Sequence, residues 1–169
     1  MSAHAQYSTP LAERYASRDM LALWSPQRRH GLWRRLWLAL AEAEQSLGVP
    51  IPDEAIAQMR DHLDDIDFAA VAAYEKRFRH DVMAHVHAFG DVAPAARGFI
   101  HYGATSCYVT DNAELILMRE ALGILRAHHA TRAVREAELL RDGFPAYTTS
   151  AGWLGYSDDK IRQLCRDGI

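Results

Sequence analysis

Three histidines, His80, His85 and His87, fall within one short stretch and are the first candidates for chemistry. Imidazole is a common zinc ligand, so a group of this kind can indicate a metal site. On a helix, however, His80 and His87 nearly superimpose, whereas His85 lies about 140° round the axis from His80. We therefore expect no metal at these residues. Separately, we expect no cofactor in the chain. The simpler interpretation is surface pairing over four residues, as between Asp81 and His85.

A second candidate is the run of small and hydroxyl residues over 103–107, which precedes a long helical pattern. Hydroxyls such as those of Thr105 and Ser106, together with backbone N–H groups at a helix N-terminus, bind carboxylate or phosphate. Arg14 and Tyr15 form a third candidate, because a guanidinium beside a phenol can hold a phosphate. Each has a simpler alternative, in which the hydroxyls only cap a helix and the arginine is solvated.

The composition is that of a folded protein without a nucleic-acid surface. The chain has 169 residues, 49% of them hydrophobic, which suits one domain with a core. Its formal net charge of -3 comes from interspersed charges without a basic patch, so we expect no nucleic-acid partner. No stretch approaches the roughly 20 apolar residues of a membrane span. Cys107 and Cys165 stand far apart, as free thiols do in a reducing compartment, and we expect a cytoplasmic protein.

The elements that position the candidate residues are predicted to be helices. Residues 1–24 show no clear period and are expected to form an irregular arm. Ser25 as N-cap, Pro26 at the first helical position and Gly48 just past the end predict a helix of about 22 residues. Asp53 is the expected N-cap of the helix that follows.

Two more short helices are expected before the long one. Asp67 is the predicted N-cap of the first of them. Residues 79–90 form either another helix or a continuation of it, and Gly90 is expected to end that segment.

Residues 110–141 are expected to form a long helix. Its start is left open between a capping box at Asp111 and Glu114 and an earlier cap at Ser106. At 1.5 Å per residue this helix would extend for about 48 Å, too far for the short upstream helices to cover. We therefore expect partner helices, from further sequence or from other subunits. One apolar face carries a heptad-like seam of Leu115, Met118, Leu122 and Leu125.

Four segments of the chain resemble the adenylosuccinate lyase family of the fumarase/aspartase superfamily, in that family's order and spacing. The resemblance covers about residues 1 to 140 and implies an all-α fold. It implies an N-terminal helical domain over 1–109 and a truncated first helix of a central bundle over 110–142. The four segments are residues 8–17, 26–48, 77–87 and 101–112.

The resemblance implies an enzyme of purine biosynthesis that eliminates fumarate. Its substrates would be adenylosuccinate, which gives AMP, and the succinylocarboxamide ribotide of IMP synthesis. It further implies a homotetramer whose sites combine residues of several subunits, so we expect a homo-oligomer or full-length lyase subunits as partners. At the matching positions, the resemblance implies that Arg14 and Tyr15 contact the phosphate end of the substrate. It implies that Arg79, His80 and Asp81 line the site, with His80 near the succinyl or catalytic acid region. Thr105 and Ser106 would hold a substrate carboxylate.

Two segments of that family have no counterpart in this sequence. One is a Thr-His-x-Gln-Pro-Ala-Gln segment with the general acid, and the other a Gly-Ser-Ser-x-Met-Pro-x-Lys-x-Asn-Pro loop with the general base. Each catalytic group contributes roughly 10²- to 10⁴-fold, so we expect an incomplete chain that is inactive alone, with His80 in a supporting role. The alternatives are a noncatalytic purine-nucleotide-binding or oligomerisation module and a nonfunctional fusion product.

The tail over residues 143–169 differs from the rest of the sequence. It is rich in Gly and aromatic residues, and a short irregular or strand-helix structure is expected. These residues resemble a fragment of L-fuconate dehydratase, a member of the enolase superfamily. That family's catalytic lysines and metal carboxylates would come later, so the resemblance implies a foreign join, from gene rearrangement or a faulty gene model, without dehydratase activity.

Overall fold

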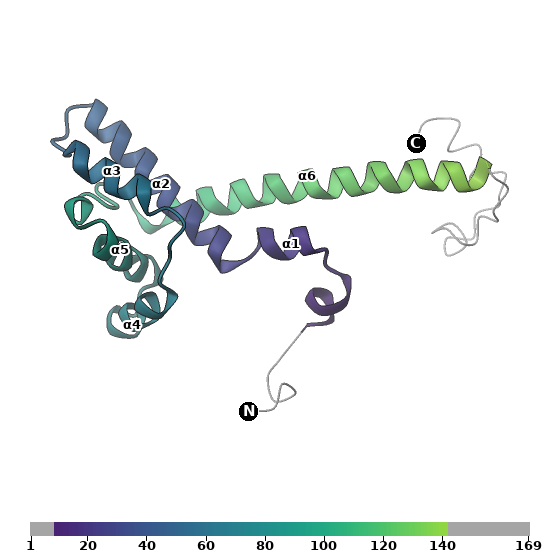
Figure 1. Ribbon diagram of the computed structural model, residues 1–169, viewed down its shortest axis with the longest axis horizontal. Helices are drawn as coiled ribbons and strands as arrows, with labels where there is room; N and C mark the ends of the chain where they lie inside the picture. Colours follow the sequence, from purple (N-terminus) through teal and green to yellow (C-terminus); the bar gives the residue numbers. More distant parts are fainter. Residues whose placement is uncertain (1–8, 142–169) are drawn as a thin grey trace. The chain divides into compact units, whose positions relative to one another are not determined.

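The computed structural model describes residues 9–141, and every regular element within them is a helix (Figure 1). The predicted all-α fold is therefore confirmed for this part of the chain. The tail over 143–169, with its expected strand, lies outside the described residues. The elements are a single π-helical turn η2 (Leu11–Tyr15), α1 (Arg18–Leu23), α2 (Pro26–Ser46), α3 (Asp53–Asp61), α4 (Phe68–Phe78), α5 (Asp81–Val92), a 3₁₀ turn η3 (Pro94–Ala96) and α6 (Ser106–Arg141).

The chain divides into two compact units, residues 1–121 and residues 122–169. The dividing point lies inside α6. The domain boundaries expected after residues 109 and 142 stay predictions. No helix within residues 9–141 is long and apolar enough to cross a membrane.

Helix α2 forms as its local signals predict. The Ser25 hydroxyl accepts a hydrogen bond from the Arg28 N–H at 3.2 Å, which satisfies one of the free donors of the first turn. Pro26 is the first helical residue, and its missing N–H costs nothing there. After Leu47 the chain turns at Gly48, whose φ of 96° favours a residue without a Cβ.

Two helix starts differ from expectation. The arm expected to be irregular contains η2 and α1, because the Ser17 hydroxyl accepts from the Met20 N–H at 3.2 Å and caps a helix that is too short to show a period. At α3 the N-cap position belongs to Pro52. Asp53 is already helical, and its carboxylate accepts from the Gln45 amide at 2.9 Å.

The prediction for the fourth and fifth helices is partly right. Asp67 caps α4 as expected, accepting from the N–H groups of Ala69 and Ala70 at 2.9 and 3.0 Å. The segment over 79–90 is a separate helix, but Gly90 does not end it, since α5 continues to Val92. A Cβ at Gly90 would lie 3.2 Å from Cγ of Arg97, so the close approach of that side chain explains the glycine.

The core of the first unit takes its large buried side chains from α2, α3, α5 and the first turns of α6. Its largest fully buried side chains are Trp37, Phe89, Met59, Leu117, Val82 and Val109. One charged residue lies among them. Arg34 is only 2% exposed, donates to the carbonyl of His62 and to the Asp65 carboxylate at 3.1 Å, and lies over the Phe89 ring at 4.5 Å. Its partners compensate the cost of burying a guanidinium.

Helix α6 begins at Ser106, so the earlier of the two expected starts is the one observed. Its first turns lie against α2. Arg28 forms a bidentate ion pair with Glu120, at 2.7 and 2.9 Å, and Arg29 pairs with Glu114 at 2.9 Å. One face of α6 is buried at these turns, through Val109, Ala113, Leu117 and Ala121.

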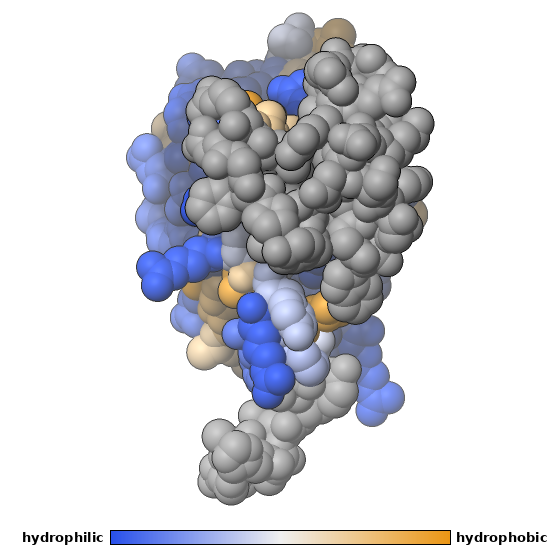
Figure 2. Space-filling model, turned by 90° about the vertical axis from the view of Figure 1, so that its right-hand side faces the viewer, coloured by the Kyte–Doolittle hydropathy of each residue, from blue (hydrophilic) through white to orange (hydrophobic). Residues whose placement is uncertain are grey.

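The expected seam of α6 is uncovered within the described residues. The exposed fractions are 60% at Leu115, 45% at Met118, 66% at Leu122 and 47% at Leu125. On the face drawn in Figure 2, hydrophobic residues are interspersed among hydrophilic ones. Single exposed apolar residues are common on protein surfaces, whereas a row of four large ones often marks an interaction surface. A helical partner would fit here.

Candidate functional site

The turn between α4 and α5 carries Arg79, His80 and Asp81. Arg79 adopts a left-handed conformation with φ 53° and ψ 39°, and its N–H donates to the Glu75 carbonyl at 2.7 Å. His80 then returns to an extended conformation and caps α5, where its Nδ1 accepts from the Met83 N–H at 3.4 Å. The reversal presents three consecutive polar residues at the start of α5.

His80 joins this turn to the start of α6. Its Nε2 lies 3.4 Å from the Ser106 hydroxyl. Because Nδ1 accepts from a backbone N–H, the ring proton is assigned to Nε2, which then donates to the Ser106 oxygen. Thr105 precedes α6 with an exposed side chain, and its carbonyl accepts from the Tyr108 N–H at 3.0 Å. Two of the seven predicted site residues, His80 and Ser106, are therefore in contact, and Arg79 and Thr105 are their immediate neighbours in the sequence.

Asp81 stands beside them at the first position of α5. One carboxylate oxygen accepts from the Val82 N–H at 2.7 Å and lies 3.5 Å from Nδ1 of His80. An acid in the first turn of a helix is favoured by the helix dipole. Its carboxylate also places a negative charge beside the His80 ring.

His101 is a neighbour that the sequence reasoning did not single out. Its Nδ1 accepts from the indole N–H of Trp37 at 3.0 Å, and its backbone is left-handed with φ 67°. Burial lowers the pKa of His101, and the charge of His80 lowers it further. The sequence feature that could have indicated His101 is its position as the first residue of the lyase-like segment over 101–112.

Arg14 and Tyr15 lie on η2, at the other candidate position. Tyr15 is 76% exposed, and no hydrogen bond or ion pair among residues 9–141 joins either residue to the other five. Their part in a shared site stays a prediction.

Comparisons with known proteins show what the part of the chain that holds these residues is similar to. No family model matches the chain. It is 53% identical over 128 residues to an adenylosuccinate lyase of Saccharomyces cerevisiae, and 52% identical over 128 residues to one of Schizosaccharomyces pombe. Each alignment covers 74% of this chain and 27% of the relative. An adenylosuccinate lyase of Bacillus subtilis is 35% identical over 115 residues, which are 68% of this chain and 26% of that one.

This N-terminal region is homologous to adenylosuccinate lyase. The resemblance of the four segments is thereby confirmed, and the chain spans about a quarter of the length of the curated relatives it matches.

The other two histidines of the short stretch lie away from the lyase-like turn. His85 is only 5% exposed and stacks on His30 with ring centroids 3.9 Å apart, so the expected surface pairing of Asp81 with His85 is wrong. His87 stacks on Phe78 at 4.5 Å. Within residues 9–141, no three His, Cys, Asp or Glu side chains are grouped so that they could hold a metal ion.

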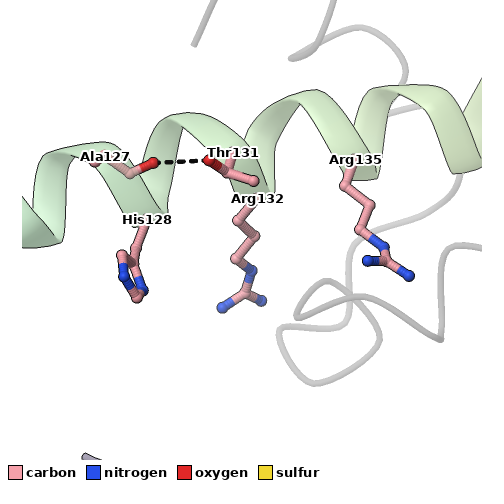
Figure 3. Close-up of a pocket in the computed structure, with 5 residues that line it drawn as sticks. All are labelled: Ala127, His128, Thr131, Arg132 and Arg135. Carbon is pink, nitrogen blue, oxygen red and sulfur yellow. Dashed lines mark hydrogen bonds between the residues drawn. The ribbon is translucent and has the colours of Figure 1, made fainter. Parts of the chain in front are cut away.

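A pocket in the second unit also lies apart from the lyase-like residues. Figure 3 shows the side chains of His128, Arg132 and Arg135 pointing to the same side of α6, while the Thr131 hydroxyl donates back to the Ala127 carbonyl at 3.0 Å. All five lining residues come from this one helix. None of the predicted site residues is among them.

Proposed function

We propose that residues 9–141 form part of the substrate site of an adenylosuccinate lyase. The reaction would be the elimination of fumarate from adenylosuccinate and from the succinylocarboxamide ribotide. The observation that carries the proposal is the contact between His80 and Ser106. It links two segments that are 26 residues apart and that the resemblance assigns to one site.

The chemistry of the turn suits a substrate with several negative charges. Arg79 supplies a guanidinium, and Thr105 and Ser106 supply hydroxyls at the start of a 36-residue helix. The free N–H groups of that helix end favour a carboxylate or phosphate. Asp81 opposes the binding of an anion, and its carboxylate is held at the start of α5 by the Val82 N–H, 3.5 Å from Nδ1 of His80.

The backbone of Arg79 supports a role for its side chain. Glycine is the usual residue where a helix ends in a left-handed conformation, because it has no Cβ. A non-glycine residue costs roughly 1 kcal/mol there. Arginine at this position is unfavourable for folding, and a ligand that needs the guanidinium would explain it.

The phosphate end of the substrate is assigned to Arg14 and Tyr15. This part of the proposal rests on the resemblance of residues 8–17. Tyr15 is exposed on η2 and its hydroxyl is accessible to a ligand.

The proposal extends to the partners of the chain. The uncovered seam of α6 would pack against other copies of this chain or against full-length lyase subunits, because a heptad-like seam fits a second helix. The lyase names of the relatives give no support to the alternative of a noncatalytic module. The cytoplasmic location stays a prediction.

A binding titration of the purified chain with adenylosuccinate and with AMP tests the site. We expect binding that weakens at least tenfold in Ser106→Ala and in Arg79→Gln, because each loses a polar contact to the anion. Arg60→Gln is the matched control, since Arg60 is exposed on α3 and pairs with Glu42. A folded chain that does not bind adenylosuccinate at millimolar concentration would contradict the proposal.

The same samples test turnover. The sequence contains neither the general acid segment nor the general base loop, so we expect no release of fumarate from the chain alone. Fumarate production by the pure chain would overturn the expectation of inactivity, but it would not contradict the proposed binding site.

A further inference from the structure

Two histidines from different helices form a stacked pair inside the first unit. The rings of His30 on α2 and His85 on α5 lie 3.9 Å apart at 29°. The Trp33 ring lies nearly perpendicular to both, with centroid distances of 4.8 and 5.2 Å, and the Phe68 ring of α4 lies 5.9 Å from that of His30. The proposed substrate site uses neither histidine.

The surroundings of this pair disfavour a positive charge. Nδ1 of His30 is buried, and the Pro26 backbone is the one nearby group on α2 that favours a proton on this ring. Burial, and then Arg29, lower the pKa of His30 to about 4. Burial, then His30 and Arg34, lower the pKa of His85 to about 3. From α5, Asp81 acts in the opposite direction on both rings, and Phe68 on α4 is uncharged.

The pair also lies close in sequence to the start of α5. His80 caps this helix and contacts Ser106, and His85 follows five positions later. A stack between α2 and α5 therefore fixes the helix that carries His80 and Asp81. Separation of the two rings would remove one of the contacts that hold α5 in place, and would therefore weaken the contact between His80 and Ser106.

We propose that the stack of His30 on His85 is a pH-sensitive latch, which holds α5 against α2 while both rings are neutral and opens on acidification. The latch stands on the geometry of the two rings. Only its effect on ligand binding rests on the proposed function.

The direction of the pH effect follows from the two states of each ring. In the unfolded or opened chain a histidine takes up its proton near pH 6.5, whereas the closed stack excludes the proton until about pH 4 or below. The stabilisation is therefore complete above about pH 7 and is lost as the pH falls below 6.5. At pH 5.5 each histidine lowers the closing constant about tenfold, and the pair about 100-fold.

The test compares the intact chain with His30→Phe, which keeps a stacking ring but cannot be protonated. Urea unfolding at pH 7.5 and pH 5.5 gives the change in the folding constant of each protein, relative to its own value at pH 7.5. Between pH 7.5 and pH 5.5, we expect the folding constant of the variant to fall by a factor about ten times smaller than that of the intact chain. His129→Gln, at an exposed position on α6, is the control and should behave as the intact chain does.

Amide hydrogen exchange shows whether the opening is local. At pH 5.5 the amides of α5 should lose protection while those of α3 keep it. In His30→Phe the loss in α5 should be about tenfold smaller, because only His85 remains to take up a proton. Equal loss in the variant and the intact chain, or simultaneous loss in α3 and α5, overturns the latch. If His30→Phe does not fold, His30→Leu replaces it. A histidine NMR titration of the intact chain decides independently, because titration of the His30 ring near pH 6.5 in the folded protein refutes the proposal.

Discussion

The indole N–H of Trp37 donates to Nδ1 of His101 over 3.0 Å, and this bond ties the middle of α2 to the loop that leads into α6. Trp37 is fully buried, whereas His101 is half-buried and left-handed. The loop between His101 and Ser106 is thus held at its first residue by the core.

Trp37→Phe removes this bond and part of a buried ring. We expect a loss of about 2–4 kcal/mol in the free energy of unfolding, from the cavity and from the unpaired imidazole nitrogen. Urea denaturation at pH 7.5 measures it. Trp24→Phe is the matched control, because that half-buried indole donates to the weakly accepting Met20 sulfur at 3.2 Å, and it should cost less than half as much. Equal costs for the two variants would show that the bond to His101 is unimportant.

Arg79→Gly should separate stability from binding. Glycine relieves the left-handed backbone, so the free energy of unfolding should rise by roughly 0.5–1 kcal/mol, while adenylosuccinate binding is lost. Arg77→Gly, on the last turn of α4, should instead destabilise by about 1 kcal/mol and keep binding. Denaturation and a binding titration on the same samples give both values. Unchanged binding in Arg79→Gly would remove Arg79 from the site.

Gly90→Ala tests the close approach of Arg97. An alanine inside a helix usually stabilises by about 1 kcal/mol relative to glycine. At Gly90 the new Cβ would meet Cγ of Arg97, whose guanidinium is held by Asp91 at 2.8 Å, so we expect a smaller gain or a loss. Gly123→Ala, on α6 where no atom of the described residues lies within 4 Å of the added Cβ, should give the full gain. Thermal unfolding compares them, and an equal gain at both positions would contradict the crowding at Gly90.

Arg34→Met tests the buried charge. The variant removes the donor to the His62 carbonyl and to one oxygen of the Asp65 carboxylate, whose other oxygen keeps its contact with Nδ1 of His62, and we expect a loss of about 3 kcal/mol. Arg35→Met breaks the exposed pair of Arg35 with Asp64 and should cost less than about 1 kcal/mol. Urea midpoints at pH 7.5 report both. A cost at Arg34 no larger than that at Arg35 would mean that methionine packs against Phe89 as well as arginine does.

The seam of α6 predicts assembly through its apolar face. Leu115→Ser combined with Leu122→Ser should lower the mass of any oligomer found by light scattering, because both residues belong to the uncovered row. Arg119→Ser, an exposed change on the same helix, is the control. A mass that is unchanged in the double variant would place the assembly surface elsewhere.

Local sequence signals predicted the helices better than they predicted the site. Ser25 with Pro26, and Asp67, act on neighbouring backbone groups, so their effect can be read from a few adjacent residues. Ser17 acts in the same way but was missed, because six-residue α1 shows no periodicity to draw attention to it.

The contacts around the site have no such local signal. The stack of His30 on His85 and the bond from Trp37 to His101 join residues that are far apart in sequence. A histidine on a helix gives the same pattern whether it is exposed or stacked, which is why His85 was placed on the surface. Recognition of the lyase segments supplied Arg79, His80 and Ser106, which helical periodicity alone could not distinguish from surface residues.

The ion pair of Arg28 with Glu120 joins residues 92 positions apart, and it has a consequence for the order of folding. Closing so long a loop costs chain entropy before any contact is gained. During synthesis, α2 leaves the ribosome long before Glu114 and Glu120 do, while α3, α4 and α5 are already available to it. The apolar surface of α2 that α6 covers therefore remains exposed on the nascent chain until the last of these contacts has been made.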